Sequence, residues 1–332
     1  MTSDIRISRR RLLVASAGLA SAAALPRRVA AQQYPSRPLR LILGFPPGGG
    51  TDAFARLLAP SLSEKLGQPV IVENKTGANG NLATEYVAKS TADGYTLLIS
   101  TSSAMVAAPH AFKNMPVDPI KDLTHISMCT ESDFCIVSNP GLPAKTFDEF
   151  VALAKREPGK IIHAAPGIGS VNQIGGELLA IRTGISLKTA QYRGSGPIIT
   201  DMLADQVNMT IMSVGLAEPY VSSGRLNALL VMSKERAPQL PNVPSSVELG
   251  IKDLDQVTFW VGLHAPKKTP DPIISRLHAT LVEALADNVL RDRMITTGLK
   301  PVGSAPPAFM ARLESDLTLY GEIFRAANIQ PE

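Results

Sequence analysis

The residues best placed for chemistry are three successive glycines, Gly48, Gly49 and Gly50, followed by Thr51 and Asp52. Glycines supply no acid, base or nucleophile, but they expose backbone N–H groups and allow conformations that a Cβ forbids. Thr51 or Asp52 can cap a following helix, whose first N–H groups lack partners and carry partial positive charge. This pattern predicts a site for a carboxylate or a phosphate. A glycine-rich turn that only reverses the chain has the same composition.

A strand and a helix must position this turn. Leu39 to Phe45 is an apolar run of the length of a buried strand, and Pro46 and Pro47 end it. Asp52 to Ala59 then carries apolar residues at helical spacing. The glycines therefore open a helix directly after a strand.

Two nucleotide motifs nearly fit the same turn. Gly44 and Gly49 match a phosphate-binding loop, but Gly50 stands where that motif needs its lysine, which excludes a nucleoside triphosphatase. Gly48, Gly50 and Ala53 fit G-x-G-x-x-A, and Glu73 closes the next strand about twenty residues on, as in dinucleotide-binding folds. An exported dinucleotide-dependent oxidoreductase is therefore an alternative hypothesis.

Similar turns recur along the chain. Strand Lys160–Ala165 runs into a glycine-rich turn before helix Val171–Arg182, and strand Leu187–Tyr192 runs into Arg193 and Gly194 before another helix. Ligands of open parallel sheets bind outside the carboxyl ends of the strands. We therefore expect turns from both halves of the chain to converge on one cleft that binds an anion.

Strand and helix patterns alternate over the whole chain, which predicts an α/β protein with mainly parallel sheets flanked by helices. About 300 residues after the leader exceed what one core usually organises, so we expect two lobes. The chain passes from the first lobe near Asp133 and returns near Thr258. Lobe 1 is then residues 32–133 plus 258–332, and lobe 2 is residues 134–257.

Residues 1–31 read as a twin-arginine signal peptide, with three arginines before an apolar run and small residues before Gln32. This predicts a periplasmic protein. The leader holds six of the 33 basic residues and one of the 29 acidic ones, so the remainder carries 27 basic and 28 acidic residues and a formal net charge of −1. That balance argues against a nucleic-acid partner.

Catalytic and metal-binding patterns are missing from the sequence. The five histidines are scattered without metal-ligand spacing, and Ser170 and Ser195 lie outside any G-x-S-x-G elbow. His163 lies near a strand end, where it faces the cleft or fills a structural position. Cys129 and Cys135 form a disulfide or remain two buried thiols. We expect no enzyme activity, catalytic residue, metal or cofactor.

Several motifs in order resemble the Bug family, the periplasmic solute-binding components of tripartite tricarboxylate transporters. These motifs are Phe45–Asp52, Asp93–Leu98, Tyr192–Pro197 followed by Asp201–Leu203, and Leu240–Pro244. The resemblance covers essentially the whole chain after the leader. It implies a two-lobed periplasmic-binding-protein fold of type II with two interlobe crossovers. It also implies a small carboxylate held by Phe45–Asp52 and Gly167–Gln173, largely through backbone amides and water.

The candidate ligand-binding residues are Phe45, Pro47, Gly48, Gly49, Thr51, Asp52, Asn81, Ser102, Gly167, Gly169, Ser170, Gln173, Arg193 and Gly194. The chain departs from the family at Gln173, Met212 and Asn79, where members often have histidine, aspartate and glycine. Without an acid at position 212, a possible acceptor for a ligand amino or hydroxyl group is lost if that position faces the cleft.

The favoured hypothesis is a monomeric receptor that delivers a small carboxylate to membrane permease subunits. Service to a membrane sensor is a second possibility, because the same binding protein can serve either partner. The oxidoreductase remains the alternative from a different class.

Overall fold

The computed structural model describes residues 34–331, and the expected signal peptide lies outside these residues. Arg37–Glu332 forms a unit separate from the segment through Ser36, and the fold reported below is that of the larger unit. Across residues 34–331, none of the helices combines the length and the apolar character needed to cross a membrane.

Two β-sheets carry the fold. Their strands are β1 Leu39–Leu43, β2 Val70–Asn74, β3 Thr96–Thr101, β4 Leu123–Ser132, β5 Phe134–Ser138, β6 Ile161–Ala165, β7 Leu187–Gln191, β8 Met209–Ser213, β9 Asn227–Met232, β10 Phe259–Pro266 and β11 Lys300–Pro301. The first sheet has the order β11-β4-β10-β3-β1-β2, and the second has the order β7-β6-β8-β5-β9.

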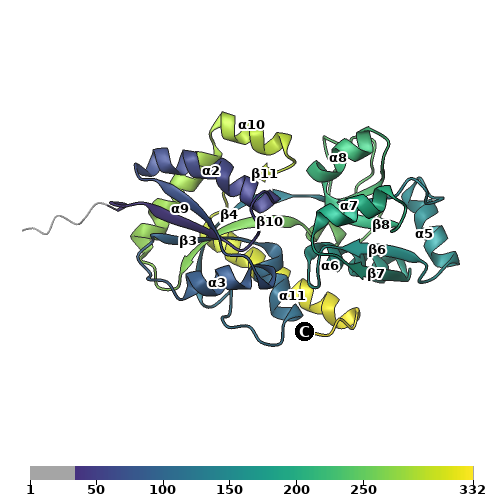
Figure 1. Ribbon diagram of the computed structural model, residues 1–332, viewed down its shortest axis with the longest axis horizontal. Coiled ribbons are helices and arrows are strands. Elements are labelled where there is room, and N and C mark those ends of the chain that lie inside the picture. The colour runs from purple at the N-terminus through teal and green to yellow at the C-terminus, as the bar shows by residue number, and fades with distance from the viewer. Residues whose placement is uncertain (1–33, 332) are drawn as a thin grey trace, which may run out of the picture. The chain divides into compact units, whose positions relative to one another are not determined.

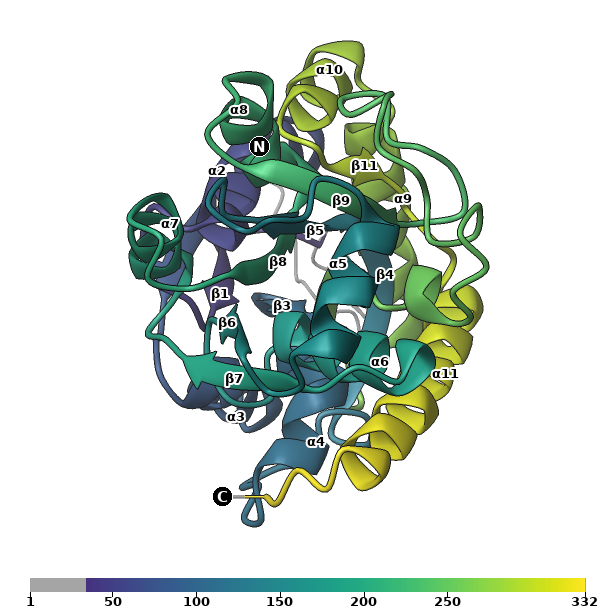
Figure 2. The same cartoon turned by 90° about the vertical axis from the view of Figure 1, so that its right-hand side faces the viewer.

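Helices flank both sheets (Figures 1 and 2). The α-helices are α2 Gly50–Leu66, α3 Asn81–Ala88, α4 Ala108–Ala111, α5 Phe147–Arg156, α6 Val171–Thr183, α7 Ser195–Leu203, α8 Val214–Ser222, α9 Asp271–Leu285, α10 Asn288–Thr296 and α11 Pro306–Ala326. Short 3₁₀ turns are η1 Ala78–Gly80 and η3 Leu254–Gln256, and η2 Ser103–Ala107 is a π-helical turn. The C-terminal helix α11 packs on β4 and η2 and also reaches α6 beside the second sheet.

The predicted two-lobed α/β fold is confirmed, with one lobe around each sheet. The chain crosses between the sheets twice, directly from β4 to β5 through Asp133 and again between β9 and β10. The expectation of mainly parallel sheets is corrected, because both sheets are mixed. β10 runs antiparallel to β3 and β4, and β5 runs antiparallel to β8 and β9. β5 and β10 are the strands that follow the two crossovers. Each begins beside the carboxyl end of a neighbouring strand, β5 beside the end of β8 and β10 beside the end of β3.

Helix α2 is longer than its sequence pattern indicates. It continues through Pro60 to Leu66, because Leu58, Leu62 and Leu66 repeat every four residues and bury one face. The expectation that Thr51 or Asp52 caps this helix is wrong. Gly49 is the N-cap, and it makes no side-chain capping bond, while both predicted caps lie inside the first turn.

Both cysteines are buried free thiols. Burial raises the pKa of the Cys135 thiol to about 12 and also raises the pKa of Cys129. They therefore behave as small apolar side chains of the core. Of the two alternatives, the structure supports the buried thiols.

Candidate functional site

A cleft of about 310 Å³ lies where strands of both sheets end. Its sixteen lining residues are Phe45, Gly50, Thr51, Asn79, Thr101, Ser103, Phe134, Pro166, Ser170, Asn172, Gly194, Ser195, Met212, Ser213, Leu216 and Phe259. They follow or close the carboxyl ends of β1, β2, β3, β6, β7 and β8, or begin β5 and β10. This is the edge at which open α/β sheets bind ligands. None of the lining residues is charged, and none is a histidine.

Two helices, one beside each sheet, begin at this cleft, and their first amides have no capping partner among the described residues. Helix α2 begins at Gly50 and α7 at Ser195, and both residues line the cleft. Their N-caps, Gly49 and Gly194, provide no side-chain acceptor for the first N–H groups. The helix dipoles add partial positive charge at both ends. The cleft can therefore hold an anion without a charged side chain.

Gly194 must be glycine for its backbone to reach this position. Its φ of 111° lies in a region that L-residues rarely occupy. The turn before α7 therefore passes the cleft without a side chain at Gly194.

Helix α6 differs from α2 and α7, because two of its first three amides are already occupied. The Ser170 hydroxyl accepts from Gln173 N–H at 3.2 Å, and Ser103 Oγ accepts from Val171 N–H at 3.4 Å. The Gln173 side chain turns back and accepts from Gly169 N–H at 2.9 Å. The second-lobe loop expected to bind a ligand therefore forms a wall of the cleft, and its best donors are committed.

Two buried side-chain atoms of the cleft have no hydrogen-bond partner among the described residues. They are the Thr101 hydroxyl and the Asn79 amide nitrogen. Thr101 is 1% exposed. Leaving a buried polar group unpaired costs about 1–3 kcal/mol. These two groups therefore point to a polar ligand or an ordered water in the cleft.

Of the fourteen predicted residues, Phe45, Thr51, Ser170 and Gly194 line the cleft. The remaining ten lie outside its lining, namely Pro47, Gly48, Gly49, Asp52, Asn81, Ser102, Gly167, Gly169, Gln173 and Arg193.

Asp52 braces the glycine turn. Its carboxylate accepts from Gly48 N–H at 3.0 Å, from Arg56 Nε at 2.9 Å and from Asn74 Nδ2 at 2.9 Å. The bond from Arg56, and to a smaller extent those from Gly48 and Asn74, lower the pKa of Asp52 to about 2 although burial opposes them. The turn is thereby held open by a charge that faces away from the cleft lining.

Ser102 and Asn81 serve the surrounding structure. Ser102 lies between two lining residues, and its hydroxyl donates to Thr258 O at 3.3 Å, on the side of the second crossover. Thr101 ends β3 and Ser103 begins the π-helical turn η2, and both line the cleft, whereas Ser102 between them does not. Asn81 contacts Met115 through its amide.

Sequence reasoning missed Phe134 and Phe259, and it named Asn79 and Met212 only as departures from the family, not as candidate binding residues; all four line the cleft. Thr101 could have been found as the last residue of its strand, because ligands of open α/β sheets bind where the strands end. Phe134 and Phe259 could not, because they begin strands that run antiparallel to their neighbours. His163 is buried in β6, is not part of the cleft lining, and has no partner for either ring nitrogen among the described residues.

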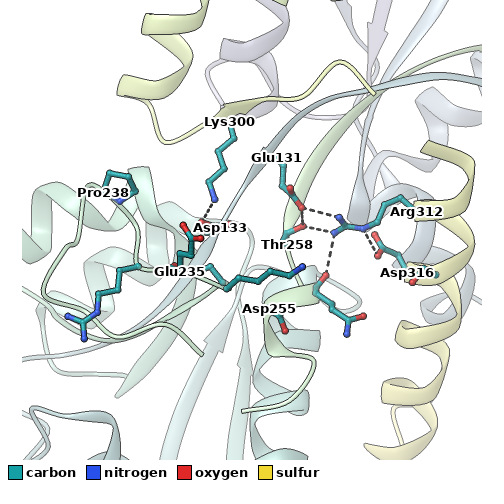
Figure 3. A pocket seen from close by; sticks show the side chains of 14 residues that line it. Glu131, Asp133, Glu235, Pro238, Asp255, Thr258, Lys300, Arg312 and Asp316 are labelled. Atoms are coloured by element: carbon teal, nitrogen blue, oxygen red, sulfur yellow. Dashed lines mark hydrogen bonds and ion pairs between the residues drawn. The ribbon is translucent and has the colours of Figure 1, made fainter. Parts of the chain in front are cut away.

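A second cavity, of about 650 Å³, lies at the two crossovers and is called here the crossover pocket (Figure 3). It is lined by Glu131, Asp133, Ser233, Lys234, Glu235, Arg236, Pro238, Asp255, Gln256, Thr258, Lys300, Arg312, Ser315 and Asp316.

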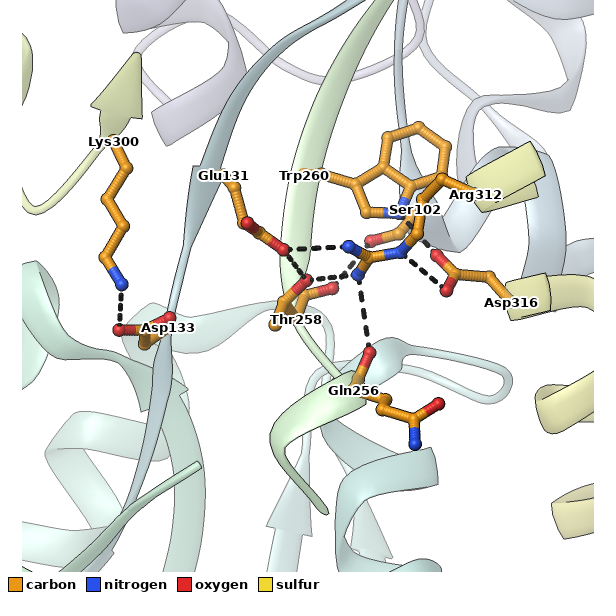
Figure 4. A network of polar contacts seen from close by, with 9 residues as sticks. All are labelled: Ser102, Glu131, Asp133, Gln256, Thr258, Trp260, Lys300, Arg312 and Asp316. Atoms are coloured by element: carbon orange, nitrogen blue, oxygen red, sulfur yellow. Dashed lines mark hydrogen bonds and ion pairs between the residues drawn. The ribbon is translucent and has the colours of Figure 1, made fainter. Parts of the chain in front are cut away.

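Many of its charges already pair within the protein (Figure 4). Arg312 binds Asp316 at 2.7 Å, Glu131 at 3.1 Å and the Thr258 hydroxyl at 2.8 Å. Trp260 Nε1 donates to Asp316 at 2.7 Å, and Lys300 pairs with Asp133. Arg312 thus joins α11 to both crossovers, and the pocket is the better candidate for a structural tie than for a ligand site.

The acid of the dinucleotide motif is also committed. Glu73 binds Arg40 through both carboxylate oxygens at 2.7 Å, and it does not line the cleft. A ribose would need that carboxylate free.

Comparison with known proteins agrees with this geometry. Residues 54–328 match the model of the tripartite tricarboxylate transporter family receptor, TctC. The chain is 35% identical over 315 residues to protein BugT of Bordetella pertussis, a match that covers 95% of this chain and 94% of BugT.

Solved structures agree in fold. The periplasmic binding protein BugD is 32% identical, with a TM-score of 0.79 over 90% of this chain and all of that one. Rpa4515 of R. palustris, solved with adipate, is 28% identical, with a TM-score of 0.82 over 90% of this chain and all of its own. The family match spans most of the chain, and the relatives are matched over nearly their full lengths. The chain therefore belongs to the TctC family of periplasmic solute-binding proteins, to which the Bug proteins it resembles also belong.

Proposed function

We propose that this chain is an exported, monomeric receptor that captures a small carboxylate in the cleft and delivers it to a tripartite tricarboxylate-type permease. The observation that carries the proposal is the pair of uncapped helix N-termini, α2 and α7, that meet at a cleft without charged side chains. Partial charges of two helices suffice for an anion of low charge, whereas a triphosphate would need fixed cations.

The Thr101 hydroxyl supports the same ligand class. It is a buried donor without a partner among the described residues, and a carboxylate oxygen would satisfy it. The relative solved with adipate carries a dicarboxylate, which is the same chemical class.

We further propose that the lobes, residues 32–133 plus 258–332 and residues 134–257, close on the ligand about hinges near Asp133 and Thr258. Each lobe supplies one of the two open helix ends, so the ligand makes its full set of contacts only in the closed state. Small-angle scattering should show a smaller radius of gyration with a bound carboxylate. An unchanged radius at saturation would argue against closure.

Thermal unfolding with a panel of ligands tests the binding function. Carboxylates at 100 times their dissociation constant should stabilise the protein by about 2.7 kcal/mol. Stabilisation by sugars or cations, with no response to carboxylates, would contradict the proposal. Mass spectrometry of the protein as purified identifies any ligand carried along, and a stoichiometric nicotinamide or flavin would instead support the oxidoreductase.

Permease delivery has its own test. Deleting the gene for this protein in its host should abolish uptake of the identified carboxylate. Normal uptake together with a lost transcriptional response would assign the receptor to a sensor.

A further inference from the structure

Several apolar side chains line the cleft, and together they are called here the apolar wall. Phe134 and Phe259 begin β5 and β10, and their rings meet edge to face with centroids 6.5 Å apart. Met212 also lines the cleft, but its register partner in β5 is Cys135, so it comes from the other face of the second sheet than Phe134, whose partner is Ser213. Phe45 and Leu216 extend the apolar lining on the α2 and α8 sides. Residues from both crossovers thus build a surface suited to a flat or branched hydrocarbon group.

The cleft lining contains no carboxylate that could pair with a positively charged group of a ligand. A ligand ammonium would meet no carboxylate there, and the N-termini of α2 and α7 would repel it. Met212 is 3% exposed, so the position that could have held such a carboxylate is filled by a thioether. Burying an unpaired charge is costly, and the cost falls on the ligand that brings it.

From this division we infer that the receptor selects carboxylates whose remaining body is apolar and ring-sized, and that it discriminates against their α-amino counterparts. The inference rests on the proposed function, because the carboxylate must sit at the open helix ends for the body to meet the apolar wall. The ends fix the acid group by N–H donors and by Thr101. Phe134, Met212 and Phe259 then set what the rest of the molecule can be.

Matched ligand pairs test this directly. Titration calorimetry would compare 3-phenylpropanoate with phenylalanine, and 4-methylpentanoate with leucine. We expect the unsubstituted acid of each pair to bind at least tenfold more tightly. Equal or tighter binding of the amino acids, or a preference for citrate or tartrate, would overturn the inference while leaving the carboxylate receptor intact. If no carboxylate bound at all, the proposed function itself would fail and the inference with it.

A variant with a matched control ties the preference to the wall. Leu216 lines the cleft in the first turn of α8 and is 37% exposed, and Val289 lies in the first turn of α10 and is 65% exposed. An aspartate is favourable in the first turn of either helix, so both variants should fold.

Leu216→Asp should weaken 3-phenylpropanoate at least tenfold and narrow its advantage over phenylalanine. Val289→Asp should leave both affinities unchanged. If folded Leu216→Asp kept the wild-type ratio between the two ligands, the apolar wall would not set the specificity and the inference would be wrong.

Discussion

The cleft and the crossover pocket are two cavities of one fold, and they differ in how their polar groups are used. The smaller one, the cleft, has no charged lining residue, yet the first amides of α2 and α7 and the Thr101 hydroxyl have no partner among the described residues. The larger one is lined by nine charged residues, including Arg312 and Asp316, which bind each other. The volume of a cavity and the charge of its lining therefore do not identify the ligand site in this protein. A ligand site is better recognised by donors that the protein has left without partners.

The polar groups of the crossover pocket have a structural role, unlike those of the cleft. Arg312 gathers α11, Glu131 and Thr258 around one guanidinium. Burial opposes its charge, but Asp316 and Glu131 outweigh that effect and raise the pKa of Arg312. Arg312 thereby ties both crossovers to α11, close to the proposed hinges.

The largest expected effect is a loss of stability on replacing Arg312, with little change in carboxylate affinity. Arg312→Met leaves Asp316, which is 3% exposed, without its ion partner, and breaking a buried pair costs about 3 kcal/mol of unfolding free energy. Carboxylate affinity of the folded variant should stay within about threefold, equivalent to roughly 0.7 kcal/mol. Denaturant unfolding and calorimetry measure the two quantities.

Arg236→Met is the matched control. Arg236 lines the same pocket but forms an exposed pair with Glu248, so its loss should cost less than about 1 kcal/mol. A tenfold loss of carboxylate affinity in folded Arg312→Met would mean that the crossover pocket belongs to the ligand site.

Lowering the pH should reduce the stability of the core without changing the affinity of the cleft. Burial lowers the pKa of His163 to about 4, below the value of 6.5 expected in the unfolded chain. The unfolded state therefore takes up the proton first. Stability from the neutral ring is complete above pH 6.5 and is lost as the pH falls toward 4, by roughly 3 kcal/mol.

His163→Leu should make the fall of unfolding free energy between pH 6.5 and 4 shallower. The cleft lining has no titratable side chain, so affinity should stay flat until the ligand's own carboxyl group titrates. A fall of affinity in wild type that begins near pH 6.5 would reveal a histidine at the site.

Replacing Thr101 should have a smaller effect, which weakens binding but does not reduce stability. Thr101→Val keeps the shape and removes a buried hydroxyl without a partner among the described residues, so the free energy of unfolding should not fall. Loss of a donor to a carboxylate should weaken binding about tenfold, or roughly 1.4 kcal/mol. Ser127→Ala, in the first sheet and outside the cleft lining, is a control that should not change affinity. Unchanged affinity in Thr101→Val would place the ligand elsewhere in the cleft.

Local patterns were enough to locate the turns but not to assign their roles. The strand before Gly48 and the helix after it follow from apolar runs and helical spacing, and the structure has both. Which turn keeps free amides depends on side chains that fold back from elsewhere. Ser103, far along the chain in the other lobe, occupies an amide of α6.

Strand direction was the other limit. A buried apolar run looks alike in either direction, so β5 and β10 were recognised as strands without their antiparallel sense. That sense places Phe134 and Phe259 at the edge where the other strands end. The apolar wall was therefore invisible until the register was known.

The central claim is that the open N-terminus of α2 binds the carboxylate, and one pair of variants tests it most directly. Gly50 lines the cleft with no atom within 4 Å of an added Cβ, whereas exposed Ala53 lies in the same first turn outside the lining. An aspartate suits either position in a helix N-terminus, so both proteins should fold. Calorimetry should show that Gly50→Asp loses at least about 100-fold in carboxylate affinity, roughly 2.8 kcal/mol, while Ala53→Asp stays within about threefold of wild type. Wild-type affinity in folded Gly50→Asp would contradict the account.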